Sequence, residues 1–115
     1  MSDDCLFCKI IAGEIPSNKV YSDDEVTAFK DINPAAPTHI LIIPNQHIAD
    51  ITATGAADQA LLGNLLLRAN QIAGREGLAK DGFRLVINTG SDGGQTVSHL
   101  HLHLLGGRAL HWPPG

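Results

Sequence analysis

The sequence predicts a single-domain α+β protein with one short helix, one long helix and a five-stranded, mainly antiparallel sheet. Its 115 residues suit one domain of ordinary size, and a hydrophobic content of 43% supplies a core. Apolar patterns follow one another in the order helix, three strands, helix and two strands, which is typical of an α+β fold. The domain is expected to span residues 1–115, with an N-terminal helix carrying a cysteine pair at 1–15 and a C-terminal tail at 106–115.

The N-terminal half contains the short helix and the first three strands. The segment "CLFCKIIAGEIPS" predicts a helix that ends near Gly13, because Pro16 blocks its continuation. "NKVYSDDEVTAFKDI" predicts a hairpin whose tight acidic turn covers residues 22–25. The irregular "NPAAP" then leads into "THILIIP", a β-branched run that predicts a buried central strand.

The C-terminal half contains the long helix and two further strands. The helix is expected to start at about Asp58 and to end near Gly74 or Gly77. Its apolar residues cover more than one stripe, so the second side must be buried either by another subunit or by loops of the same chain. "FRLVINT" and "VSHLHLHLLGG" predict the last two strands, and "GSDGGQT" predicts a glycine-rich loop between them. The tail "RALHWPPG" is expected to be stiff and extended.

Composition excludes several partners. A formal net charge of −4 and an aromatic content of 4% argue against nucleic-acid binding. No apolar run reaches the ~18 residues of a membrane span. The acidic start "MSDDCLFCKI" lacks the features of a secretory signal, and two cysteines are too few for a disulfide scaffold. We therefore expect a cytoplasmic protein with no membrane partner.

The most informative segment is "SHLHLHLL", in which histidine and leucine alternate at residues 99–104. On a strand, His99, His101 and His103 would share one face while the leucines enter the core. Such a row can bind metal, supply a nucleophile and an acid or base, or hold an anion. The alternative is a solvated strand face that happens to be rich in histidine. The glycine-rich loop directly before the row favours phosphate, because its amides can form an anion-binding nest.

These segments resemble a known family. "GQTVSHLHLHLLGGR" resembles the His-x-His-x-His signature of the histidine triad superfamily of nucleotide hydrolases and transferases. "KIIAGEIPSNKVYSDDEVTAFKDINPAAPTHILIIP" and "GGRALHWPPG" are similar to its nucleotide-binding branch, the purine nucleoside phosphoramidases. The resemblance covers about residues 8–115. It implies a homodimer whose sheets join across the interface, and cleavage of P–N or acyl-phosphate bonds in purine nucleotide substrates through a nucleotidyl-histidine.

The resemblance also implies roles for individual residues. His101 would be the nucleophile on the α-phosphorus, His103 would contact the phosphate, and His39 would be a fourth active-site histidine. Trp112 would lie near the active site of the partner subunit. The remaining nucleotide-binding positions implied by the resemblance are Asp31, Ile32, Asn88, Gly94, Gln95 and Thr96.

Some of these residues have simpler interpretations. Asp31 can initiate the turn before Pro34, and Asn88 can be a turn former at a strand end. Ile32 fits the core as well as a pocket wall. Trp112 can serve in plain dimer packing.

The spacing of Cys5 and Cys8, C-x-x-C, is half of a structural zinc site. The resemblance suggests His47 and His99 as the other two ligands of one structural Zn²⁺, which would make His99 structural rather than catalytic. Two free thiols are the alternative. A redox pair fits poorly because no strand precedes the motif.

Two other functions remain open from the sequence. A dinucleoside polyphosphate hydrolase would use the same nucleophile. A zinc-bearing nucleotide-binding module would show little catalysis. The sequence identifies neither the leaving group nor the preferred purine.

Overall fold

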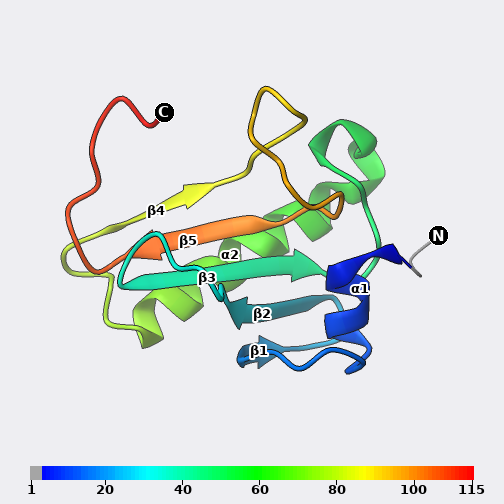
Figure 1. The fold of residues 1–115 in the computed structure, drawn as a ribbon, viewed down its shortest axis with the longest axis horizontal. Coiled ribbons are helices and arrows are strands. Elements are labelled where there is room, and N and C mark those ends of the chain that lie inside the picture. Colours follow the sequence, from blue (N-terminus) through cyan, green and yellow to red (C-terminus); the bar gives the residue numbers. More distant parts are fainter. Residues whose placement is uncertain (1–3) are drawn as a thin grey trace.

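The computed structural model describes residues 4–115, so the first three residues of the predicted N-terminal segment 1–15 lie outside the described part. The main elements follow the predicted order (Figure 1). They are α1 (Leu6–Ile11), β1 (Lys19–Ser22), β2 (Val26–Lys30), β3 (Thr38–Pro44), α2 (Gln59–Arg75), β4 (Phe83–Val86) and β5 (Leu102–Gly106). Two short 3₁₀ turns, η2 (Ile51–Ala53) and η3 (Ala56–Asp58), lead into α2.

The five strands form one sheet in the order β1-β2-β3-β5-β4, and each neighbouring pair is antiparallel. The hairpin turn is made as predicted, because the Asp23 carboxylate accepts from the backbone N–H groups of Glu25 and Val26, both at 2.8 Å. The buried run of β3 occupies the centre, next to β5. The α+β prediction with five strands is confirmed.

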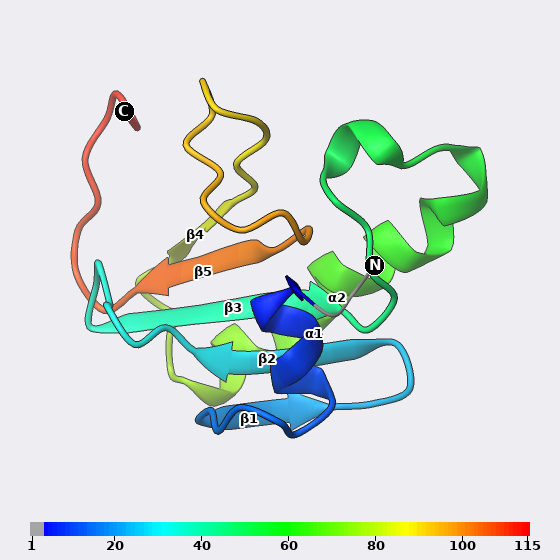
Figure 2. The same ribbon diagram turned by 45° about the vertical axis from the view of Figure 1, so that its right-hand side comes forward.

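The two helices cover opposite faces of the sheet (Figure 2). Helix α2 packs on the face that carries Ile40, Ile42 and the leucines of the histidine segment, and these residues form the larger core. Helix α1 packs on the other face, where Phe7 and Ile10 meet Phe29, Leu41 and Ile43. The alternation of "HLHLHL" therefore directs its leucines toward α2 and its histidines toward α1.

The last strand is shorter than predicted, because β5 begins at Leu102 and leaves His99 and His101 before its start. The physical reason lies in β3, which ends at Pro44. Proline has no N–H to extend the ladder, and its carbonyl accepts from the ring Nε2–H of His99 at 2.8 Å instead. The N–H of Leu100 bonds the carbonyl of Ile48 at 2.7 Å. The strand predicted in "FRLVINT" likewise ends early, at Val86.

Helix α2 starts and ends within a residue or two of the predicted limits. Its inner face, including Leu65, Ala69 and Ile72, is buried, whereas Leu66 and Leu67 on another side are exposed. Loops of the described chain therefore do not cover the second apolar side. No helix within residues 4–115 has the length and hydropathy needed to cross a membrane.

Candidate functional site

A hollow of about 310 Å³ opens beside α1, on the face of the sheet that carries the histidines. Its apolar lining residues include Phe7, Ile10 and Phe29. Its polar lining residues include Asp31, Thr96, His101 and His103. The full lining is Leu6, Phe7, Ile10, Ile15, Pro16, Ser17, Phe29, Lys30, Asp31, Ile32, Asn33, Leu41, Thr96, Val97, His101 and His103. A pocket with mostly apolar walls and a few convergent polar groups is the usual form of a small-molecule site.

The backbone decides which ring nitrogen of His101 carries the proton. Nδ1 of His101 lies 2.7 Å from the carbonyl oxygen of His99, and a carbonyl only accepts, so Nδ1–H donates. The neutral ring then keeps its lone pair on Nε2. The Phe7 ring packs edge-on against the same imidazole, with centroids 5.1 Å apart. His101 is thus held in one tautomer and one orientation at the wall of the hollow.

A second chain of contacts fixes the tautomers of His39 and His103. The backbone N–H of Ala35 donates to Nδ1 of His39 at 3.0 Å, so the proton of neutral His39 sits on Nε2. Nε2 of His39 lies 2.9 Å from Nδ1 of His103, which must therefore accept. The proton of neutral His103 then sits on its own Nε2. One main-chain amide determines the proton positions of two imidazoles.

Burial keeps these rings neutral. Desolvation lowers the pKa of His103 to about 4, and the positive charges that His101 and His39 can carry lower it further, while the Asp31 carboxylate opposes the change. Desolvation also lowers the pKa of His39, again opposed by Asp31. At neutral pH both rings are therefore uncharged, as the donor and acceptor pattern requires.

Two buried side-chain atoms within residues 4–115 have no hydrogen-bond partner, Oγ of Ser17 and Nε2 of His103. Both residues line the hollow. An unsatisfied buried polar group costs about 1–3 kcal/mol. An acceptor atom of a ligand, such as a phosphate oxygen, would satisfy the Nε2–H of His103.

The two carboxylate oxygens of Asp31 make different contacts. One carboxylate oxygen accepts from the N–H of Asn33 at 2.8 Å, which confirms the turn interpretation. The other lies 3.5 Å from Nε2 of His39, and the residue also lines the hollow. The neighbouring Ile32 is 90% exposed, so the core interpretation of this residue is wrong and its side chain is free to face a ligand.

The glycine-rich loop is braced by the amide of Gln95. Its oxygen accepts from the N–H of Gly90 at 3.0 Å, and its nitrogen donates to the carbonyls of Ala49 and Val97 at 2.8 and 2.9 Å. Gly94 adopts a φ of 80°, a conformation that a side chain would strain. Of the predicted loop positions, Thr96 lines the hollow, whereas Gly94 and Gln95 shape the loop that precedes it in the sequence.

Asn88 follows the end of β4 by two residues. Val86, the last residue of β4, pairs with His103 in the antiparallel register, and Asn88 is not among the residues that line the hollow. Trp112 is 80% exposed in the tail. The tail is tied to the sheet through Arg84, which donates to the carbonyl of His111 at 2.8 Å.

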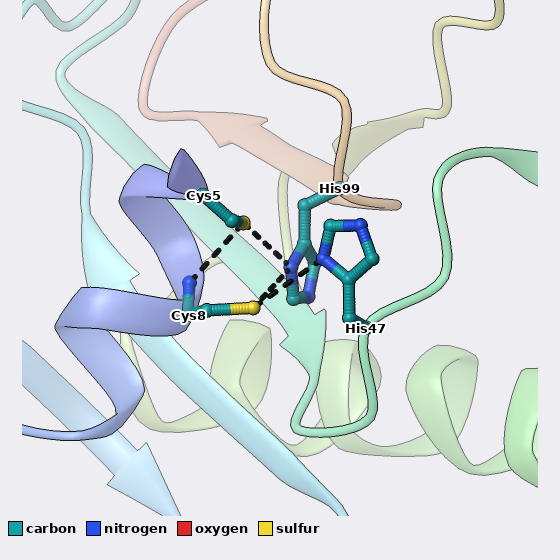
Figure 3. Close-up of side chains that lie close together, drawn as sticks. All are labelled: Cys5, Cys8, His47 and His99. Atoms are coloured by element: carbon teal, nitrogen blue, oxygen red, sulfur yellow. Dashed lines mark hydrogen bonds between the residues drawn. The ribbon is translucent and has the colours of Figure 1, made fainter. Parts of the chain in front are cut away.

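Four predicted metal ligands converge at the N-terminal end of α1, where Cys5 and Cys8 meet His47 and His99 (Figure 3). Nδ1 of His99 lies 3.2 Å from the sulfur of Cys5 and 3.5 Å from that of Cys8, and Nδ1 of His47 lies 3.3 Å from the sulfur of Cys8. A tetrahedral Zn²⁺ places sulfur and nitrogen ligands about 3.5 Å apart. Because the Nε2–H of His99 donates to the carbonyl of Pro44, its Nδ1 lone pair faces the cysteines as a ligand must. These four residues fit a metal ion.

The thiol of Cys8 favours the protonated form when no ion is bound. Burial raises the pKa of the Cys8 thiol to about 11, and its contact with Cys5 adds to the effect. Coordination requires the thiolate, so metal binding at this group releases protons.

Asp31, His39 and His103 also lie close enough to share an ion, but their proton positions oppose it. An ion on Nε2 of His39 would displace that proton to Nδ1, where the N–H of Ala35 already points. Two donors would then face each other. This second group is a hydrogen-bond chain, in contrast to the cysteine group.

The structure thus places five of the predicted nucleotide-site residues at one hollow: Asp31, Ile32, Thr96, His101 and His103. The four predicted metal ligands form a separate group. Sequence reasoning missed the helix side of the hollow, formed by Leu6, Phe7 and Ile10. Their signal was the apolar spacing of "LFCKII" around the cysteine pair. The amide of Ala35 carries no sequence signal, because every residue except proline offers one.

Comparisons with known proteins agree with this architecture. Residues 12–110 match the family model of the HIT domain. The chain is 59% identical over 115 residues to an uncharacterized HIT-like protein of Synechococcus elongatus, covering both chains completely. It is 54% identical over 110 residues to the purine nucleoside phosphoramidase of Escherichia coli K12, covering 96% of this chain and 92% of that protein.

Solved structures show the same fold. The crystal structure of a HIT family hydrolase from Legionella pneumophila superimposes with a TM-score of 0.96 at 56% identity, covering 97% of this chain and all of that one. A histidine triad protein from Clostridium difficile gives 0.92 at 47% identity, covering 95% of each chain. With the family model matching most of its length and relatives this similar, the chain belongs to the HIT domain family.

Proposed function

We propose that this protein is a purine nucleoside phosphoramidase that cleaves a P–N or acyl-phosphate bond at the α-phosphorus through a nucleotidyl-histidine. One observation carries the proposal. The hydrogen bond from His101 Nδ1–H to the carbonyl of His99 leaves the Nε2 lone pair available at a hollow of nucleotide size. The name of the Escherichia coli relative, 54% identical, supports the same activity.

The chemistry follows from the proton positions. Nε2 of His101 attacks the α-phosphorus, and the bond from phosphorus to the leaving amine breaks with its electron pair on the amine nitrogen, which takes up a proton. Water then attacks the nucleotidyl-histidine and releases the nucleoside monophosphate together with His101. Imidazole suits both steps, because it is a nucleophile when neutral and a good leaving group afterwards.

The surrounding residues orient the nucleotide. The Nε2–H of His103 is the unpartnered donor that would hold a phosphate oxygen, while His39 keeps His103 in the donating tautomer. Thr96, with Asn88 and the loop of Gly94 and Gln95, would complete the phosphate or leaving-group contacts.

The nucleoside would occupy the apolar half of the hollow. The Asp31 carboxylate can accept from both hydroxyls of the ribose. Ile32, exposed beside it, would close on the base. An apolar wall recognises the shape of a purine and does not hydrogen-bond to the groups on its edge that distinguish adenine from guanine. Both adenine and guanine nucleotides are therefore expected substrates.

We further propose one structural Zn²⁺ on Cys5, Cys8, His47 and His99. The fit of their distances and the orientation of His99 support it. The ion would supply cross-linking rather than chemistry at phosphorus, because its ligand set is closed. A reducing cytoplasm would keep the two thiols available.

A homodimer is supported by apolar surface that the single chain leaves open. Leu66 and Leu67 on α2, Ile87 beyond the edge strand β4, and Trp112 in the tail are all exposed. A second copy that continues the sheet at β4 would cover part of this surface, and the tail would then reach the partner's hollow.

The test uses His101→Asn, whose side-chain amide can still donate to the carbonyl of His99. With an adenosine phosphoramidate we expect turnover to fall by about 10³-fold or more, while the fold and binding of adenosine monophosphate persist. Intact mass spectrometry of the wild type during turnover should show a transient nucleotidyl adduct on His101. Normal turnover by the variant would overturn the mechanism. A higher rate on diadenosine polyphosphate would instead favour the polyphosphate hydrolase, and nucleotide binding without any turnover would favour a binding module.

A further inference from the structure

The metal group and the nucleotide hollow share one structural element, helix α1. Cys5 caps this helix, its sulfur accepting from the N–H of Cys8 at 3.3 Å, and Cys8 lies in its first turn. The helix is six residues long, and helices shorter than about 12 residues are marginal without tertiary support. The position of α1 therefore depends on its tertiary contacts, and so does any site that its side chains form.

The same helix builds the apolar wall of the hollow. Leu6, Phe7 and Ile10 lie between and after the two cysteines, and all three line the hollow. The Phe7 ring packs edge-on against Phe29 on the base side, with centroids 5.4 Å apart, and against His101 on the phosphate side. It also packs against the ring of His99, with centroids 5.8 Å apart.

His99 provides a second connection to the nucleophile. Its ring belongs to the metal group, and its carbonyl accepts from Nδ1–H of His101. Any movement of His99 shifts the acceptor that orients the attacking ring.

We propose that metal binding by Cys5, Cys8, His47 and His99 sets the affinity of the hollow for nucleotides, with Phe7 as the positioning residue between them. When the group is loaded, α1 is cross-linked to the loop of His47 and the segment of His99, and Phe7 is held against Phe29 and His101. When it is empty, the wall is free to move and the base loses its packing. The ribose and phosphate contacts lie on other elements, at Asp31, Thr96 and His103, and are retained. The inference rests on the proposed nucleotide site, and it adds that the metal group controls it.

The experiment measures binding rather than turnover. The dissociation constants of adenosine monophosphate and of ribose 5-phosphate are determined by calorimetry for zinc-loaded protein and for protein treated with a chelator. We expect chelation to weaken adenosine monophosphate binding by about tenfold or more, equivalent to ~1.4 kcal/mol of lost base packing, and to change ribose 5-phosphate binding by less than about twofold. Circular dichroism confirms that the chelated protein is folded.

His47→Ala is the most informative variant, because His47 is exposed and does not line the nucleotide hollow. It should bind less zinc and lose adenosine monophosphate affinity, and saturating zinc should restore part of the loss. Gln46→Ala, an exposed neighbour in the same loop, serves as the matched control and should behave as wild type. Phe7→Leu should lose base affinity even with zinc bound, which separates the positioning role from loss of the ion.

Equal affinities of loaded and chelated protein for adenosine monophosphate would overturn the coupling while leaving the phosphoramidase intact. An equal loss for ribose 5-phosphate would also overturn it, since general loosening rather than the wall would be the cause. Failure of zinc to bind at all would refute the metal group. Absence of binding by adenosine monophosphate to loaded wild type would refute the proposed nucleotide site itself.

Discussion

Acidification offers a direct test of the hydrogen-bond chain from Ala35 to His103. Burial lowers the pKa of His103 from 6.5 to about 4, with further lowering by His101 and His39 and opposition from Asp31. The difference corresponds to roughly 3 kcal/mol in favour of the neutral ring in the folded protein. Because the unfolded ring takes up its proton near pH 6.5 and the folded ring only near 4, the stability from this residue is complete above pH 6.5 and decreases as the pH falls toward 4.

Between pH 7 and pH 5, the linkage relation gives a loss of about 2 kcal/mol from His103. The assay compares urea unfolding of the wild type and of His103→Asn, whose amide oxygen still accepts from His39 but does not titrate. Metal release and the titration of histidines that do not contact His103 are common to both proteins, so the difference between their pH dependences reports His103 together with its coupling to His39 and His101. NMR of the ring should show a midpoint near pH 4 and the neutral proton on Nε2. A midpoint near 6.5, or a proton on Nδ1, would refute the reasoning.

Two further predictions concern the loop and the subunit contact. A Cβ on residue 93 would lie 2.7 Å from the backbone nitrogen of Thr89 and closer still to its carbonyl oxygen, so Gly93→Ala should displace the loop and weaken adenosine monophosphate binding in calorimetry. Gly55→Ala, at an exposed position with nothing within 4 Å and an extended φ of −147°, is the control and should bind as wild type. In sedimentation velocity at micromolar concentration, the wild type should have twice the chain mass of 12.2 kDa, and Leu67→Lys should shift it toward the monomer. A wild-type monomer would contradict the dimer.

The order and type of the elements could be predicted from the sequence because they depend on local patterns. The 3.6-residue period of α2 and the alternation of residues 99–104 are local properties, and burial follows them: Leu100, Leu102 and Leu104 are at most 2% exposed. The two-sided apolar pattern of α2 was also informative, because Leu67 on its second side is 63% exposed in the single chain.

The limits of the last strand depend on a residue far away in the sequence. Alternation alone predicts a strand through His99 and His101, but a strand also needs a partner that donates and accepts. Pro44 ends that partner, and its carbonyl bonds to the ring of His99. The sequence shows where a proline is, but it does not show which residues it will face in the sheet.

In the candidate site, too, some residues could be predicted from their side-chain type, whereas others depend on their position in the fold. Histidines, cysteines and Asp31 have side chains that can bind metal, attack phosphorus or accept hydrogen bonds, so they could be proposed as site residues from the sequence. The contributions of Phe7 and Ala35 depend on their positions in the fold. The ring of Phe7 packs against His101, and the backbone N–H of Ala35 donates to His39. Their roles became visible only with the fold.

The three histidines of the row show how a fold assigns different chemistry to identical side chains. Each ring has one nitrogen committed to a neighbour, and the identity of that neighbour decides the other nitrogen's role. For His99 the carbonyl of Pro44 accepts from the Nε2–H, and Nδ1 keeps a lone pair that faces the cysteines. For His101 the carbonyl of His99 accepts from the Nδ1–H, and Nε2 keeps its lone pair at the hollow. His103 instead accepts at Nδ1 from His39, so its Nε2 is left as a donor. Two main-chain carbonyls and, through His39, one main-chain amide therefore set the proton positions that the proposed metal ligand, nucleophile and anion donor need. Moving any of these backbone groups would exchange a lone pair for a proton at the site.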